Sequence, residues 1–229
     1  MIDKQQLPRE LHISYGTFLQ HTFVEKATGK QHIALTLGAW CENDPVPVRI
    51  HSECLTGDVF GSARCDCGDQ LKLTLEMFQC WGVGLLIYLR QEGRGIGLVN
   101  KIRAYELQDQ GLDTVDANLA LGFSADDRSY DFVPDILSSL DIGSVQLLTN
   151  NPDKIRSLKN LGVNVMGRIP IEPELKPESA DYMRAKMERM GHILSPMVVD
   201  QNEGQDGTDG PYSFCDGRGS NPWLCCVTL

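Results

Sequence analysis

The residues that most clearly could do chemistry are three closely spaced cysteines, Cys54, Cys65 and Cys67, in the pattern C-x10-C-x-C. Thiolates favour zinc, and three of them on a short glycine-containing segment can converge on one ion. A structural zinc usually has four protein ligands, whereas a catalytic zinc keeps one position for a water that it activates. Spacing alone leaves open a catalytic zinc, thiols without a metal, and a structural zinc closed by Cys41, Cys80 or His51.

Two predicted junctions between a strand and a helix could bind an anion. The first is the glycine-rich segment 91–98, where the backbone can approach a ligand closely and Arg94 adds a fork of donors. It matches neither G-x-G-x-x-G nor a Walker A loop, so it could equally be only a turn. The second is segment 149–154, where a capped helix begins and Lys154 stands in its first turn. A helix N-terminus with a lysine suits phosphate, although a solvent-exposed lysine is the alternative.

Further side chains could move protons. Asp126 could accept a proton while Arg128 binds phosphate, although such residues are also common in polar loops. Tyr105 falls on a predicted helix, where a tyrosine is usually half-buried with its hydroxyl at the rim. Together with the cysteines, these residues indicate a metallohydrolase that acts on a phosphorylated small molecule, and they leave its substrate open.

The elements that must position these residues follow from hydrophobic periodicity. Strands are predicted over residues 11–24, 31–40, 46–51 and 83–89, and helices over 69–81, 98–110 and 178–190. A βαβ unit is predicted from strand 145–149, a helix capped by Asn151, and strand 163–169, so its strands should be parallel. The predicted fold class is α/β (mixed α+β): a mixed sheet with flanking helices, a C-terminal βαβ unit and a zinc-binding loop.

Composition narrows the function further. The net charge of -10 argues against broad nucleic-acid binding, which needs a basic face. The sequence has no apolar run of about 18 residues and no apolar region near its start, so neither a membrane span nor a secretory signal is expected. We therefore expect a cytoplasmic protein, in which clustered cysteines are metal ligands or catalytic groups rather than disulfides. Residues 1–195 are predicted to form the catalytic domain, and 196–229 an acidic, glycine-rich, disordered tail.

Seven ordered segments between residues 11 and 194 closely resemble the GTP cyclohydrolase II family: 49–58, 64–71, 90–98, 100–105, 113–118, 121–128 and 147–154. Enzymes of this family convert GTP to a diamino-ribosylamino-pyrimidinone phosphate, formate and pyrophosphate, an early step of riboflavin biosynthesis. The resemblance implies zinc on the three cysteines, a zinc-activated water that attacks C8 of guanine, magnesium with the triphosphate, and a homodimer. Two features depart from the family pattern: we expect no dihydroxybutanone-phosphate synthase domain before residue 11, and the tail after residue 195 matches no family segment, so cutting the chain at Leu194 is expected to leave activity intact.

The resemblance also assigns roles to individual residues. GTP contacts are implied for Arg49, Ile50, His51, Ser52, Glu53, Gln70, Glu92, Gly93, Arg94, Thr114, Thr149 and Lys154. Asp126 would be the general base, and Tyr105 would accompany complete removal of the formyl group. Arg128 would be either a nucleophile at the α-phosphate or a stabiliser of charge, and its permanently protonated guanidinium favours the second role. Two rivals remain: a relative that stops at the formamido product or takes another purine nucleotide, and a non-catalytic nucleotide sensor with structural zinc.

Overall fold

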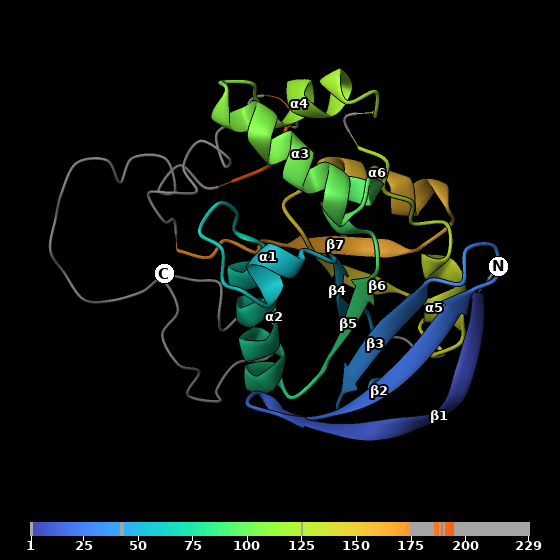
Figure 1. The fold of residues 1–229 in the computed structure, drawn as a ribbon. Coiled ribbons are helices and arrows are strands. Elements are labelled where there is room, and N and C mark those ends of the chain that lie inside the picture. Colours follow the sequence, from blue (N-terminus) through green and yellow to red (C-terminus); the bar gives the residue numbers. More distant parts are fainter. Residues whose placement is uncertain are drawn as a thin grey trace, which may run out of the picture.

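A single mixed sheet forms the centre of the molecule (Figure 1). The computed structural model describes residues 2–41, 44–124, 126–174, 186, 187, 189 and 191–194. Within them the sheet has seven strands in the order β1-β2-β3-β5-β4-β6-β7. The strands are β1 (Ile2–Ile13), β2 (Gly16–Glu25), β3 (Gln31–Leu37), β4 (Val46–Ser52), β5 (Gly84–Leu89), β6 (Val145–Leu148) and β7 (Val165–Ile169).

The sheet changes from antiparallel to parallel pairing at β5. Strands β1, β2, β3 and β5 pair antiparallel, with Leu35 opposite Leu86. Strands β5, β4, β6 and β7 are parallel, with Ile50 opposite Ile87. Nearly every residue of β4 and β5 is buried, as expected for parallel strands covered on both faces. The predicted mixed sheet is therefore confirmed, and the carboxyl ends of β4, β5 and β6 meet at one edge.

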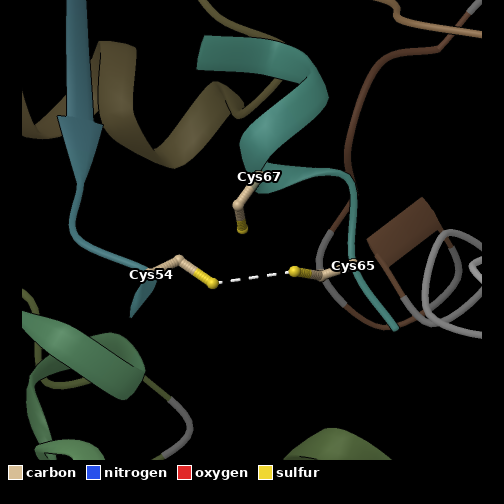
Figure 2. A group of neighbouring side chains, drawn as sticks. All are labelled: Cys54, Cys65 and Cys67. Carbon is tan, nitrogen blue, oxygen red and sulfur yellow. Dashed lines mark hydrogen bonds between the residues drawn. The ribbon is translucent and has the colours of Figure 1, made fainter. Parts of the chain in front are cut away.

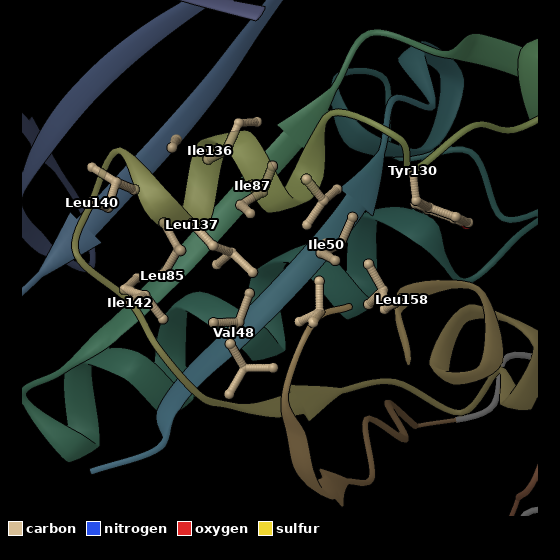
Figure 3. Close-up of a cluster of buried hydrophobic side chains, with 14 of the residues drawn as sticks. Val48, Ile50, Leu85, Ile87, Tyr130, Ile136, Leu137, Leu140, Ile142 and Leu158 are labelled. Atoms are coloured by element: carbon tan, nitrogen blue, oxygen red, sulfur yellow. The ribbon is translucent and has the colours of Figure 1, made fainter. Parts of the chain in front are cut away.

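Helices cover both faces of this sheet. They are α1 (Leu55–Asp58), α2 (Cys67–Trp81), the 3₁₀ turn η1 (Glu92–Gly95), α3 (Leu98–Asp109), α4 (Thr114–Ala120), α5 (Val133–Ser138) and α6 (Pro152–Asn160). On one face, Ile136 and Leu137 of α5 pack with Leu158 of α6 against the central strands (Figure 3). On the other face, Phe78 of α2 packs against Leu86. These two cores fix the strand ends that carry the polar residues described below.

The predicted βαβ unit is confirmed. The side chain of Asn151 accepts a hydrogen bond from the Asp153 N–H at 2.8 Å, and Pro152 occupies the first turn of α6. Gly162, with φ of 83°, follows the helix end, and β6 and β7 run parallel. The strand-to-helix junction that holds Lys154 therefore has the local structure that its sequence predicts.

Other predicted elements are wrong or incomplete. The single strand over 11–24 is a hairpin, because the chain turns before Gly16, whose φ is 121°. The polar residues 2–10 belong to β1, a largely exposed edge strand that lacks an apolar pattern. Helices α1 and α4 were not predicted. Of the helix expected over 178–190, the described residues 186, 187 and 189 are helical, and the proposed tail 196–229 lies outside the described residues. None of the helices that the structure describes has the length and apolar character of a membrane span.

Candidate active site

A pocket of about 530 Å³ opens where the carboxyl ends of β4, β5 and β6 meet. Such ends of parallel strands commonly form ligand sites. Its walls include Cys54 after β4, Glu92 after β5 and Thr149 after β6. Every site residue predicted from the sequence lines this pocket except Ile50 and Asp126. The structure thus gathers segments that lie far apart in the sequence.

The three cysteines converge on one point beside the pocket (Figure 2). Cys54 follows β4, whereas Cys67 begins α2, and all three sulfur atoms lie within 4.8 Å of one another. The Sγ atoms of Cys54 and Cys65 are 3.6 Å apart. Within the described residues the cluster has no fourth His, Cys, Asp or Glu ligand, and Cys41 and Cys80 are exposed. Cys41, Cys80 and His51, which could have closed a structural site, therefore do not join the cluster. Its three protein ligands match the number found in a catalytic zinc site.

The surroundings of the cluster fit a soft divalent cation. Hydrogen bonds from Cys65 and Cys67 lower the pKa of Cys54, and the hydrogen bond to Cys54 raises the pKa of Cys65 to about 11. Without a cation, one thiolate therefore hinders ionisation of the others, so a metal would supply the missing positive charge. A Cβ atom built on Gly57 would lie 3.0 Å from Cys65 Sγ and 3.2 Å from Cys54 Sγ. The glycine thus leaves space for the sulfur atoms to converge.

A buried lysine supports the cluster from α3. Lys101 Nζ donates hydrogen bonds to Cys54 Sγ at 3.1 Å, Thr56 Oγ1 at 3.0 Å and Glu92 Oε1 at 2.8 Å. The other carboxylate oxygen of Glu92 accepts from the Leu55 N–H at 2.6 Å. Glu92, which the resemblance assigned to GTP, therefore also ties η1 to α1 and α3. Lys101 was not predicted, although it lies on the same helical face as Tyr105, four residues on.

Tyr105 lines the pocket beside this lysine. The guanidinium carbon of Arg64 is 4.9 Å from the centre of its ring, and Lys101 Nζ is 5.8 Å from it. Burial raises the pKa of Tyr105, so its hydroxyl stays protonated at neutral pH. It can therefore donate a hydrogen bond or a proton to a molecule in the pocket.

Asp58 holds together the backbone of Cys54 and two aromatic side chains near the cysteine cluster. Its two carboxylate oxygens contact His51 Nε2 at 3.0 Å, the Cys54 N–H at 3.0 Å and the Tyr88 hydroxyl at 2.7 Å. Burial lowers the pKa of His51, so the imidazole is neutral and its Nε2–H donates to Asp58. That hydrogen bond leaves Nδ1 of His51 as an acceptor. No local pattern marks Asp58 beyond its place in a segment that resembles the family.

Cations gather at the other end of the pocket. Arg49 donates to the Leu148 carbonyl oxygen at 3.1 Å and to Gln70 Oε1 at 2.5 Å. Lys154 is only 5% exposed, and its Nζ donates to the Ile50 carbonyl oxygen at 2.8 Å. Burial, followed by the charges of Arg49 and Arg128, holds the pKa of Lys154 well below its usual value. An anion bound here would relieve that unfavourable charge, so this end suits phosphate, and the alternative of an exposed lysine is wrong.

The loop of Asp126 and Arg128 packs against the glycine-rich turn. Arg128 Nε donates to Asp126 Oδ1 at 2.7 Å, and the Asp127 N–H donates to the Arg94 carbonyl oxygen at 3.0 Å. Burial would raise the pKa of Asp126, but its hydrogen bonds with Arg128 lower it overall, so the carboxylate is ionised. A Cβ atom on Gly95 would lie 2.6 Å from the Asp127 carbonyl oxygen. The glycine-rich segment is therefore more than a turn, because it brings Arg94 and Arg128 to the same pocket.

Comparisons with known proteins agree with this geometry. Residues 4–170 match the family model described as GTP cyclohydrolase II. A GTP cyclohydrolase-2 from Neisseria meningitidis is 51% identical over 190 residues, covering 83% of this chain and 94% of that protein. One from Buchnera aphidicola is 50% identical over 195 residues, covering 85% and 98%. A riboflavin biosynthesis protein from Vibrio vulnificus is 50% identical over 198 residues, covering 86% of this chain and 53% of its own length.

The family model spans most of the chain, and the two GTP cyclohydrolase-2 relatives are about half identical to it over nearly their whole length. Together these matches identify the family without relying on any single motif. The segments matched include the cysteine cluster, the glycine-rich turn and the start of α6. The chain therefore belongs to the GTP cyclohydrolase II family, whose members are enzymes of riboflavin biosynthesis.

Proposed function

We propose that this protein hydrolyses GTP, in a zinc-dependent reaction, to a diamino-ribosylamino-pyrimidinone phosphate, formate and pyrophosphate. The observation that carries the proposal is the presence of a three-thiol cluster and a cationic end in one pocket. The pocket volume of about 530 Å³ is within the usual range for a small-molecule site. We further propose that magnesium accompanies the triphosphate, that the protein is a cytoplasmic homodimer, and that it binds neither nucleic acid nor membranes.

The two ends of the pocket suggest how the nucleotide is oriented. The buried cations Arg49 and Lys154, with Arg128, would bind the phosphates. The purine would then lie toward the cysteines, where a zinc ion held by Cys54, Cys65 and Cys67 would supply Lewis-acid chemistry and activate water. The neutral His51 offers its Nδ1 as an acceptor to the purine edge.

The remaining polar residues would move protons or stabilise charge. Ionised Asp126 would accept a proton at the edge of the pocket, and the protonated hydroxyl of Tyr105 would act in the step that releases formate. Arg128 keeps its charge and is held by three hydrogen bonds to Asp126, so it would stabilise charge on the phosphates rather than attack them.

Measuring zinc content together with formate and pyrophosphate release from GTP tests the proposal. We expect about one zinc per chain and both products, and we expect Cys65→Ser to lose both zinc and turnover. Cys41→Ser, which changes an exposed cysteine outside the cluster, is the matched control. Pyrophosphate without formate would indicate a divergent enzyme, whereas GTP binding without turnover would indicate a nucleotide sensor. Full activity in metal-free protein would contradict the zinc mechanism.

A further inference from the structure

A short C-terminal segment forms part of the pocket wall, although it lies beyond the residues that the family model matches. We define it as the described residues 186, 187, 189 and 191–194. The family model ends at residue 170, yet Lys186 and His192 both line the pocket. Neither residue was predicted from the sequence, because nothing in the local pattern indicates that this segment returns to the sheet edge.

Contacts with three different elements hold this segment in place. Lys186 pairs with Asp66, the residue between Cys65 and Cys67. Arg189 pairs with Asp113, whose carboxylate caps α4. The Ile193 N–H donates to the Asn150 carbonyl oxygen, just after β6, at 2.9 Å. These elements surround the pocket, so the segment crosses from the cysteine cluster to the cationic end.

His192 has an unsatisfied polar atom at this position. Its Nε2 is buried and has no hydrogen-bond partner among the described residues. Buried polar atoms are nearly always paired, and an exception beside a pocket points to a missing ligand. Burial lowers the pKa of His192 to about 3, so its imidazole is neutral. A neutral imidazole can carry its proton on Nε2 and donate it.

The charges near His192 indicate which part of a ligand would meet it. Lys186, Arg128 and Lys154 contribute positive charge there, and Asp66 contributes negative charge. Asp66 pairs with Lys186 and Asp126 pairs with Arg128, so the charge of Lys154, which meets a backbone carbonyl oxygen, leaves the balance positive and favours an anion. A phosphate chain fits these charges better than the uncharged guanine base.

We propose that His192 contacts the substrate by donating a hydrogen bond from Nε2 to a phosphate oxygen, with the C-terminal segment completing the phosphate end of the pocket. This inference rests on the proposed function, since it takes the ligand to be a nucleoside triphosphate. It assigns to a residue outside the family-model match a role in binding, and it leaves the reaction at the purine to the residues described above.

Calorimetric binding of inorganic tripolyphosphate and of guanosine, each to the zinc-loaded protein, tests this inference independently of turnover. We expect His192→Ala to raise the Kd for tripolyphosphate about tenfold, or about 1.4 kcal/mol, and to leave the Kd for guanosine unchanged. His192→Gln should recover part of the lost affinity, because its amide can donate from a similar position. Ile193→Ala is the matched control, since that residue is 47% exposed and its contact with Asn150 is made by its backbone N–H, which alanine keeps.

The outcomes separate this inference from the proposed function. Tripolyphosphate binding by His192→Ala at the wild-type Kd would overturn the inference, as would equal weakening for guanosine. An equal loss in Ile193→Ala would also overturn it, because the effect would then belong to docking of the segment. If wild-type protein released neither formate nor pyrophosphate from GTP, the proposed function would fail, and the tripolyphosphate comparison would still decide the role of His192.

Discussion

Replacing Gly57 with alanine adds one methyl group to the space between the three cysteines. The new Cβ would lie 3.0 Å from Cys65 Sγ and 3.2 Å from both Cys54 Sγ and Cys67 Cβ. These contacts are closer than carbon and sulfur atoms normally approach, so at least one cysteine must shift by a few tenths of an ångström. The backbone at Gly57 does not have a positive φ, so the substitution adds no conformational strain.

The size of the effect follows from the tolerance of metal sites. Ligand distances in zinc sites vary by only about 0.2 Å, and disturbing the groups that orient zinc ligands typically weakens metal binding about 10- to 100-fold. We therefore expect Gly57→Ala to weaken zinc binding at least about tenfold, or about 1.4 kcal/mol. Because Gly57 lies in α1, alanine should favour the helix itself by about 1 kcal/mol. The metal-free protein should therefore unfold no more easily than wild type.

Competition with a chromophoric zinc chelator gives the affinity, and thermal unfolding of metal-free protein gives the stability. Gly143→Ala is the matched control, since its φ is not positive and its Cβ would meet no atom within 4 Å. Wild-type zinc affinity in Gly57→Ala would refute the inferred metal position. Equal loss of stability with and without zinc would instead show that the methyl group disturbs the fold and not the metal.

Three further predictions concern the rest of the pocket. Lys154→Met should raise the unfolding temperature, because it removes a buried ammonium group whose pKa is depressed, and thermal unfolding measures this effect. The same substitution should weaken tripolyphosphate binding at least about tenfold, as measured by calorimetry. Tyr105→Phe should lose formate release far more than ring opening, measured by formate assay and by ultraviolet absorbance, and equal losses would contradict the proposed role of the hydroxyl. When the C-terminal segment is docked on the pocket wall, burial lowers the pKa of His192 from 6.5 to about 3. Between these two pH values the undocked segment binds more protons than the docked one. Docking of the segment should therefore weaken as the pH falls below about 6.5. Hydrogen exchange at the Ile193 amide should therefore show a lower protection factor at about pH 5 than at neutral pH, and equal protection would contradict this.

Local patterns predicted the parts of this site that depend on neighbouring residues. The spacing of the cysteines is a property of one short segment, and the cap of α6 needs only Asn151 and Pro152. The nearly continuous run of apolar residues in β5 likewise predicted a buried strand. Family resemblance then supplied many of the residues that line the pocket, although not Lys101, Lys186 or His192, because seven segments in order are far more specific than any one of them.

Other features depend on residues distant in the sequence, and no local pattern could reveal them. By its sequence Lys154 resembles an exposed residue on a capped helix, but its ammonium group contacts the Ile50 carbonyl oxygen on strand β4. The edge strand β1 was missed because an exposed edge carries little apolar periodicity. His192 could not be predicted because its position depends on the tethers of the C-terminal segment to Asp66 and Asn150.

Lys101 and Lys154, two of the three buried lysines that line the pocket in the described part of the chain, differ in role: the charge of the first is structural, and the charge of the second is expected to bind a ligand. Lys101 meets a carboxylate at 2.8 Å and a thiol sulfur at 3.1 Å, so its positive charge is neutralised within the chain and helps to hold the cysteine cluster. Lys154 instead meets a backbone carbonyl oxygen, with the ring of Tyr130 5.6 Å away. These dipolar neighbours do not cancel a full charge, and the nearby arginines oppose it. An anion at this end of the pocket would relieve the unfavourable charge of Lys154, so we expect the stability that this buried charge costs to be recovered as affinity for phosphate.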